Sequence, residues 1–254
     1  MTAKITVRDL TMAYGDLVVM HDLNFEIQDK DIFVIMGGSG CGKSTLLRHL
    51  IGLQEPAKGS IFYGEEDFTA SNPDERSAFM RRFGVMYQSG ALWSSLTLGE
   101  NISMPLEESG KMNAASVRDL VAYKLALVGL SGFEDFYPAQ ISGGMKKRAA
   151  IARAMALDPD ILFLDEPSSG LDPLSSRRLD DLILGLRDSQ GSTIVIVTHE
   201  LASIFNIGTK ALFLDTATKT QGAIGPPCEL RDQSENPAVQ LFLNRGDTPE
   251  SKSS

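Results

Sequence analysis

A glycine-rich segment between two hydrophobic runs constrains this chain of 254 residues more than any other feature. Residues 37–44 read Gly-Gly-Ser-Gly-Cys-Gly-Lys-Ser and match the pattern G-x-x-x-x-G-K-[ST] at every fixed position. Residues 32–36 before it have the composition of a buried parallel strand, and residues 43–53 after it have a helical pattern. Glycines let backbone N–H groups turn toward an anion, and a helix start offers further unpaired donors. The segment therefore predicts a phosphate-binding loop in an α/β fold.

The composition limits the class of protein. Hydrophobic residues make up 43% of the chain and charged residues 22%, which is typical of a globular protein. The 24 basic and 33 acidic residues give a net charge of −9, so no nucleic-acid partner is expected. Two cysteines are too few for a disulfide framework. The apolar runs are much shorter than the roughly twenty residues of a membrane span, which predicts a cytoplasmic protein unless a partner holds it at a membrane.

The order of hydrophobic patterns predicts one α/β domain over residues 1–246. Strand patterns occupy both ends of this range, with buried runs at 32–36, 161–164 and 193–197. Helical patterns cover 73–82, 114–129, 144–156 and 175–187. We therefore expect an α/β core at about 1–88 and 159–230, and an inserted α-helical subdomain at about 89–158. A capped helix is predicted at about 236–244, and the short polar segment 248–254 is expected to be disordered.

A second candidate site follows the apolar run at 161–164, which ends in Asp165 and Glu166. Ligands of α/β sheets bind at the carboxyl ends of the strands, where this run would deliver its two carboxylates. Asp165 would hold Mg²⁺, and Glu166 would act on the attacking water as a general base. An apolar run that ends in Asp-Glu is a weak signal alone, and the phosphate loop strengthens it.

A third candidate site lies between these two, at Ser142-Gly143-Gly144. One interpretation is an ordinary helix start with Ser142 as the N-cap. However, two glycines destabilise the first turn of a helix, so some compensation is expected. A serine, two glycines and a helix N-terminus also form a second surface that favours phosphate. Use of both surfaces on one nucleotide would require a second copy of the chain facing the first.

The whole set of motifs resembles the nucleotide-binding subunit of ATP-binding cassette (ABC) transporters, over residues 1 to about 230. The matching motifs are the Walker A loop at 37–45, a Q-loop at Gln88, the signature at 141–145, Walker B at 161–165 followed by Glu166, a D-loop at 169–172, a switch histidine at His199 and an adenine-stacking aromatic at Tyr14. The resemblance implies a P-loop NTPase fold with an N-terminal antiparallel β region. At the fifth signature position Met145 stands where the family usually has Gln.

The resemblance also implies a head-to-tail homodimer that holds two ATP molecules with Mg²⁺. The residues that would bind the nucleotide are Tyr14, Gly37, Gly38, Ser39, Gly40, Cys41, Gly42, Lys43, Ser44 and Thr45, with Ser142, Gly143 and Gly144 in trans. Glu166, His199 and Gln88 would be catalytic, and Ser44, Gln88 and Asp165 would hold the metal. Asp172 would link the two subunits. A buried core histidine is the alternative interpretation of His199.

The segments 88–93 and 142–154 further resemble the ATPase of Mla-type phospholipid transporters, which are associated with MCE-domain proteins in Gram-negative envelopes. This resemblance implies an integral permease and an MCE-domain protein as partners, at the cytoplasmic face of the inner membrane. The first alternative is the ATPase of an importer for a polar solute such as an amino acid. The second is a non-transport ABC protein acting on DNA or ribosomes, which the single cassette and the negative net charge disfavour.

Trp93 and the predicted C-terminal helix each leave two interpretations open, and Cys41 has one. Trp93, the only tryptophan, is either buried in the helical subdomain or part of a docking groove for a permease helix. Residues 239, 242 and 243 share a face of the predicted C-terminal helix, which packs on its own domain or on the neighbouring subunit. Cys41 is interpreted as a tolerated small residue of the phosphate loop, where alkylation would block ATP binding.

Overall fold

The computed structural model describes residues 3–110 and 112–245 of the chain. These residues form two compact units, one from the segments 3–72 and 197–245 and the other from the segment 73–196. The first unit joins the two ends of the chain, and the second is a continuous middle segment. The segment 248–254, which was expected to be disordered, lies outside the described residues.

The first unit contains a four-stranded antiparallel sheet in the order β2-β1-β4-β5. Its strands are β1 (Ile5–Tyr14), β2 (Leu17–Ile27), β4 (Lys58–Tyr63) and β5 (Glu66–Asp67). Side chains alternate between buried and more exposed along parts of β1 and β2, as expected for a sheet with one covered face. This sheet confirms the antiparallel β region expected at the N-terminus.

The same unit carries the strand that leads into the glycine-rich loop. β3 (Ile32–Gly37) is buried at every position and pairs in parallel with β9 (Lys210–Asp215). β9 in turn pairs antiparallel with β10 (Thr220–Gly225). The helices of this unit are α1 (Lys43–Leu50), α7 (Leu201–Ile207), α8 (Pro227–Gln233) and α9 (Pro237–Leu243). Burial of β3 explains its continuous apolar sequence.

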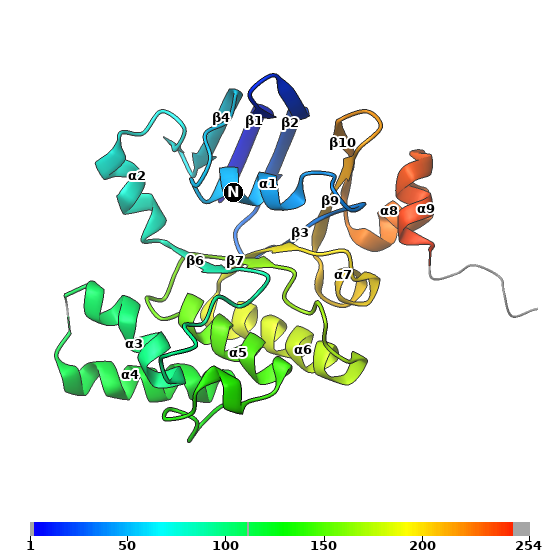
Figure 1. The fold of residues 1–254 in the computed structure, drawn as a ribbon. Helices are drawn as coiled ribbons and strands as arrows, with labels where there is room; N and C mark the ends of the chain where they lie inside the picture. The colour runs from blue at the N-terminus through cyan, green and yellow to red at the C-terminus, as the bar shows by residue number, and fades with distance from the viewer. Residues whose placement is uncertain (1–2, 111, 246–254) are drawn as a thin grey trace, which may run out of the picture. The chain divides into compact units, whose positions relative to one another are not determined.

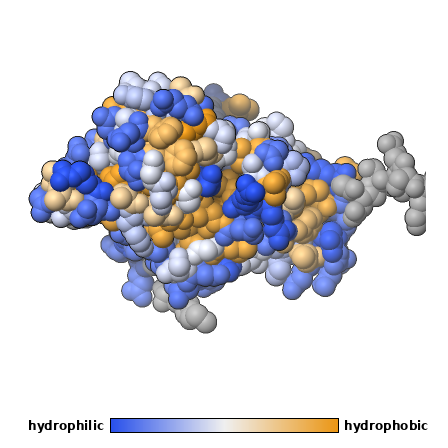
Figure 2. Space-filling view, turned by 90° about the horizontal axis from the view of Figure 1, so that it is seen from below, coloured by the Kyte–Doolittle hydropathy of each residue, from blue (hydrophilic) through white to orange (hydrophobic). Residues whose placement is uncertain are grey.

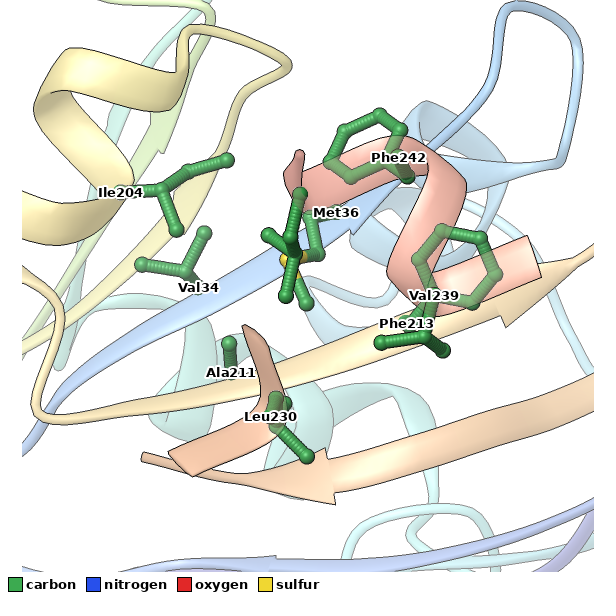
Figure 3. Close-up of a cluster of buried hydrophobic side chains, with 9 residues drawn as sticks. Val34, Met36, Ile204, Ala211, Phe213, Leu230, Val239 and Phe242 are labelled. Carbon is green, nitrogen blue, oxygen red and sulfur yellow. The ribbon is translucent and has the colours of Figure 1, made fainter. Parts of the chain in front are cut away.

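The C-terminal helix α9 packs on its own unit. Val239, Phe242 and Leu243 are buried in a cluster with residues of β3, β9, α7 and α8 (Figure 3). The ring of Phe242 meets that of Phe213 at a centroid distance of 5.4 Å. The side chain of Asn236 caps the helix by accepting a hydrogen bond from the N–H of Ala238. These three side chains therefore pack on their own domain, which was the first of the two interpretations of this helix.

The second unit holds the other parallel strands and the longer helices (Figure 1). β6 (Phe83–Met86) pairs in parallel with β7 (Ile161–Asp165), and β8 (Thr193–Val197) is the next strand beyond β7. The remaining elements are α2 (Pro73–Met80), α3 (Leu98–Glu108), α4 (Ala114–Leu127), the short 3-10 helix η1 (Pro138–Gln140), α5 (Gly143–Ala154) and α6 (Pro173–Gln190). The helical stretch between β6 and β7 is present, as the sequence predicted.

Helix α6 is longer at both ends than the predicted range 175–187. Asp172 caps its start by accepting hydrogen bonds from the N–H groups of Leu174 and Ser175, and Pro173 occupies the first turn. Gly191, with φ of +67°, ends the helix in the left-handed conformation. Hydrophobic periodicity could not predict where the helix begins and ends, because capping residues set both ends.

The surface carries apolar side chains among polar ones, as the view from below shows (Figure 2). In the second unit the large exposed hydrophobic residues include Trp93, Tyr123, Tyr137 and Leu174. Trp93 is 56% exposed, so the interpretation of Trp93 as a buried residue is wrong. Among the described residues, no helix is both long enough and apolar enough to span a bilayer.

Candidate functional site

The glycine-rich loop begins where β3 ends, and its first residue must be glycine. Gly37 has φ of +148°, and a Cβ there would lie 2.7 Å from both Sγ of Cys41 and the carbonyl oxygen of Leu214. Gly40 and Gly42 have φ of +75° and +94°. L-residues with a side chain rarely adopt such angles. The loop therefore has the tight, left-handed turns by which backbone N–H groups are directed toward an anion.

The N-terminus of α1 follows the loop directly. Gly42 occupies the N-cap position, and no side chain of the described residues caps it. The partial positive charge of a helix start and its N–H groups favour bound phosphate. A Cβ at Gly38 or Gly40 would meet nothing within 4 Å in the described structure, so the loop has open space on that side. These features fit a phosphate chain.

Lys43 places its ammonium group over the same loop. Its Nζ donates to the carbonyl oxygens of Gly37 and Gly38, each at 2.9 Å, and lies 3.9 Å from Sγ of Cys41. A cation held at this point can form charge-assisted hydrogen bonds with phosphate oxygens. Ser44 and Thr45 follow in the first turn of α1.

Tyr14 lies at the end of β1, close to the first turn of α1. Its hydroxyl oxygen is 3.5 Å from Oγ1 of Thr45, and this bond lowers the pKa of the phenol from its usual value. The side chain is 47% exposed, so part of the ring is accessible to a stacking partner. The first unit therefore brings together the aromatic residue and the phosphate loop that the sequence singled out.

His199 also belongs to the first unit. The N–H of Thr198 donates to the carbonyl oxygen of Ile35 at 3.2 Å, which places the next residue near the carboxyl end of β3, where the loop starts. His199 is exposed, so the alternative of a buried core histidine is wrong. Arg245, just beyond α9, donates to the carbonyl oxygen of His199. The C-terminal segment thus contacts the backbone of the candidate switch residue.

The second unit carries the two carboxylates. Asp165 is the last residue of β7 and Glu166 follows it, with exposed fractions of 9% and 7%. Met86 of β6 pairs with Leu164 of β7, so the parallel strands end at the same edge of the sheet. Gln88 lies two residues beyond β6 and is exposed at this edge. The structure therefore groups Gln88, Asp165 and Glu166 within one unit.

Lys147 joins these two strand ends, and the sequence motifs did not single it out. Its Nζ donates to the carbonyl oxygen of Gln88 at 2.6 Å and to that of Glu166 at 3.2 Å. Burial lowers the pKa of this ammonium group, while the charges of Glu166 and Asp165 act in the opposite direction. The only available signal was its position, about one helical turn after the Ser-Gly-Gly sequence.

The Ser-Gly-Gly sequence forms the start of α5. Oγ of Ser142 accepts a hydrogen bond from the N–H of Met145 at 3.3 Å, so the predicted N-cap is present. A Cβ at Gly143 would lie 3.9 Å from Leu171, and one at Gly144 would lie 3.7 Å from Ser175. These are ordinary van der Waals distances. The packing of the described chain therefore does not explain why both positions are glycine.

The oxygen-bearing side chains fit Mg²⁺ bound together with a nucleotide. Mg²⁺ in such sites keeps several waters and takes one or two protein carboxylates together with phosphate oxygens. In the described parts of the chain, no group of three or more His, Cys, Asp or Glu residues forms a metal cage. Asp165 at the end of β7 and the hydroxyl of Ser44 are ligands of the kind that Mg²⁺ takes in nucleotide sites.

An exposed turn at residues 91–97 lies in the second unit. The N–H of Trp93 donates to Oδ1 of Asn101 at 2.8 Å, and Nδ2 of Asn101 donates to the carbonyl oxygens of Trp93, Leu96 and Thr97. Arg153 donates to the carbonyl oxygen of Ala91. Asn101 is fully buried on α3. No sequence pattern pointed to this residue, because its role depends on the path of the turn.

Comparisons with known proteins place the chain in a family. The ABC transporter family model matches residues 20–169, more than half of the chain. The chain is 38% identical over 244 residues to the probable ribonucleotide transport ATP-binding protein mkl of Mycobacterium tuberculosis, which covers 96% of this chain and 67% of that protein. It is 34% identical over 245 residues to the intermembrane phospholipid transport system ATP-binding protein MlaF of Haemophilus influenzae, which covers 96% of this chain and 92% of that protein.

Two further comparisons also match ATP-binding proteins of this kind. The methionine import ATP-binding protein MetN of Xanthomonas campestris is 37% identical over 240 residues, covering 94% of this chain and 71% of that protein. Among solved structures, the dimeric post-hydrolysis state of the ATP-binding cassette MJ0796 bound to ADP and Pi superposes with a TM-score of 0.79. That match is 28% identical and covers 87% of this chain and 98% of the other.

The chain belongs to the ABC transporter family. ABC ATPases bind ATP with Mg²⁺ and hydrolyse it to power transport, they dimerise, and they pair with a membrane permease. The chain is therefore the ATPase subunit of an ABC transporter, with the α/β P-loop fold expected from its motifs.

Proposed function

We propose that this ATPase powers phospholipid transport across a Gram-negative envelope, as the partner of a permease and an MCE-domain protein at the inner membrane. The observation that carries the proposal is the resemblance of segments 88–93 and 142–154 to Mla-type ATPases, including Met145. The relation to MlaF, along nearly the whole length of both chains, supports it.

In this proposal each candidate residue has its own role toward ATP. Tyr14 stacks on adenine, while the loop 37–45 and Lys43 bind the phosphates. Ser44, Asp165 and Gln88 are the residues that would hold Mg²⁺, which supplies charge neutralisation at the phosphates. Glu166 accepts a proton from the attacking water, and His199 donates a hydrogen bond to the γ-phosphate. The position of Lys43 over the loop and of Asp165 at the end of β7 supports these roles.

We further propose that the active form is a head-to-tail dimer in which Ser142, Gly143 and Gly144 contact the ATP bound by the other subunit. Ser142 and Gly143 are exposed at the start of α5. The two glycines have room for a Cβ within the described chain, so a close approach by another molecule would explain them. Phosphate oxygens of a nucleotide held by the second copy fit this helix start.

Trp93 is the residue that we propose docks against a permease helix. It is exposed, and Asn101 fixes the backbone on which it is displayed. An exposed aromatic residue on a rigid turn is typical of an interface anchor. Trp93→Ala should weaken recovery of the permease with the tagged ATPase and leave the unfolding temperature unchanged. Full recovery of the permease with this variant would rule out the docking role.

The alternative function is the ATPase of a transporter for a polar solute. The relations to mkl and MetN favour it, because both are at least as similar to this chain as MlaF. The cargo is selected by the permease and its partners, so the ATPase chemistry is the same in both cases. The two functions therefore differ in the proteins and ligands that accompany this chain.

The deciding experiment is a pull-down from native membranes. Glu166→Gln removes the base, and this variant should hold the closed dimer in the presence of ATP. The tagged variant would be extracted in mild detergent with ATP or without nucleotide, and the co-purifying proteins and lipids identified by mass spectrometry. A permease with an MCE-domain protein and bound phospholipid is the expected result. A permease with a soluble solute-binding protein would overturn the lipid cargo and leave the ATPase assignment intact.

A further inference from the structure

Lys147 occupies the point where three parts of the second unit meet. It projects from α5, and its ammonium group donates to the backbone of Gln88 after β6 and of Glu166 after β7. An ammonium group has three N–H donors, so one lysine can hold both carbonyl oxygens at once. Both contacts are to backbone carbonyl oxygens. Lys147 therefore holds the path of the main chain and does not pair with a charged side chain through them.

The contact with Glu166 has a specific consequence. Glu166 has φ of +48°, a left-handed conformation that is rare for a residue other than glycine. Its carbonyl oxygen also accepts a hydrogen bond from the N–H of Ser169 at 3.3 Å. These two donors stabilise a backbone conformation that Glu166 would not favour alone. The direction of the Glu166 side chain depends on this conformation.

The other end of the connection is the start of α5. Ser142, the N-cap, precedes Lys147 by about one and a half helical turns, so the two residues move together with the helix. In the proposed function, Ser142–Gly144 contact ATP held by the partner subunit, whereas Glu166 acts on ATP held by its own subunit. A shift of α5 caused by the ATP of the partner subunit would therefore be passed through Lys147 to Glu166, which acts on the second ATP.

We propose that Lys147 is a positioning residue that couples the start of α5 to Glu166 and Gln88 of the same chain. The inference depends on the proposed dimer and on the proposed role of Glu166. Lys147 touches neither substrate nor reacting atoms. It transmits the closure of one nucleotide site to the base of the second site, so that hydrolysis becomes cooperative in ATP.

The neighbouring lysine provides a matched control. Lys146 lies on the same turn of α5, is exposed, and carries the same charge. Lys147→Met removes the donors and keeps most of the length of the side chain, whereas Lys146→Met changes the net charge equally without altering either contact. Lys147→Arg keeps N–H donors at the same position.

The test is steady-state ATP hydrolysis by the purified full chain as a function of ATP concentration. Lys147→Met should lower kcat by about tenfold to a hundredfold, because a charge-assisted hydrogen bond that positions the base is lost. Its KM should change by less than about threefold, and its Hill coefficient should fall toward that of independent sites. Lys146→Met should match the wild type in all three quantities, and Lys147→Arg should recover most of the kcat.

The outcomes separate this inference from the proposed function. Unchanged kcat and Hill coefficient in Lys147→Met would overturn the coupling role, while an inactive Glu166→Gln variant measured in parallel would leave the proposed function standing. Full turnover by Glu166→Gln would instead overturn the role of Glu166. If Lys147→Met does not fold, Lys147→Arg decides: a folded Arg variant with wild-type cooperativity supports the inference, and one without it overturns it.

Discussion

The ammonium nitrogen of Lys43, the first residue of α1, lies 2.9 Å from the carbonyl oxygen of Gly37, the first residue of the glycine-rich loop. A second bond of the same length joins it to the carbonyl oxygen of Gly38. The lysine therefore closes the loop on itself, and its charge is concentrated where phosphate oxygens would bind.

Removal of this cation should weaken ATP binding strongly. We expect Lys43→Met to lower the affinity by about tenfold to a hundredfold, the range typical of a lost hydrogen bond to a charged group. Lys58→Met, which removes an exposed cation at the start of β4, should change the affinity by less than about twofold. Titration with a fluorescent ATP analogue measures both, and equal affinities in the two variants would contradict the expectation.

Two glycine substitutions should change stability in opposite directions. Gly37→Ala places a methyl group 2.7 Å from the backbone oxygen of Leu214, which cannot move aside, and should lower the free energy of unfolding by more than about 1 kcal/mol. Gly185 lies inside α6, and a Cβ at this position would meet nothing within 4 Å in the described structure. Gly185→Ala should therefore raise the free energy of unfolding by about 0.5–1 kcal/mol. Urea unfolding would show the two opposite shifts, and shifts of the same sign would refute the reasoning.

The two cysteines should differ in reactivity toward iodoacetamide. Cys41 is 1% exposed, and burial raises the pKa of its thiol, although the charge of Lys43 opposes this. Because the thiolate is the reactive form, alkylation of Cys41 should be slow at neutral pH and should accelerate as the pH rises. Cys228 is exposed and should react first.

The loss of ATP binding should match the fraction of Cys41 that is alkylated, and alkylation of Cys228 should not affect it. Peptide mass spectrometry of a time course, with ATP binding measured on the same samples, tests this. The Cys228→Ser variant leaves Cys41 as the only thiol. ATP binding that survives complete alkylation of Cys41 would show that the loop tolerates the added group.

Adjacent residues of α9 should have very different effects on stability. Phe242 is buried against Phe213 in the core cluster, so Phe242→Ala should lower the free energy of unfolding by about 3–5 kcal/mol. Leu241 is 77% exposed, and Leu241→Ala should change it by less than about 0.5 kcal/mol. Thermal or urea unfolding compares the two. Similar losses in both variants would mean that α9 does not pack as described.

The sequence predicted the elements that follow from local patterns. The apolar runs at 32–36, 161–164 and 193–197 became the buried strands β3, β7 and β8, because strands covered on both faces need continuous hydrophobic side chains. The loop at 37–44 was predicted from its residues alone. The assignment of Asp165 and Glu166 to a strand end followed from the same run, and the structure places both there.

Contacts between distant segments could not be predicted. The exposure of Trp93 depends on how Asn101 holds a turn eight residues away, and the role of Lys147 depends on the meeting of two strand ends with α5. The contact of Arg245 with the backbone of His199 joins residues 46 positions apart. Hydrophobic periodicity carries no information on such pairs, because it reports only which face of an element is covered.

The turn at residues 91–97 is anchored through its main chain. Arg153 and Asn101 bind carbonyl and N–H groups, so replacement of the Trp93 side chain leaves the path of the turn unchanged. If this turn docks a permease as proposed, its exposed side chains can change one at a time while its backbone keeps the same path. Under that proposal, substitutions confined to this turn would adapt the same ATPase to a different permease.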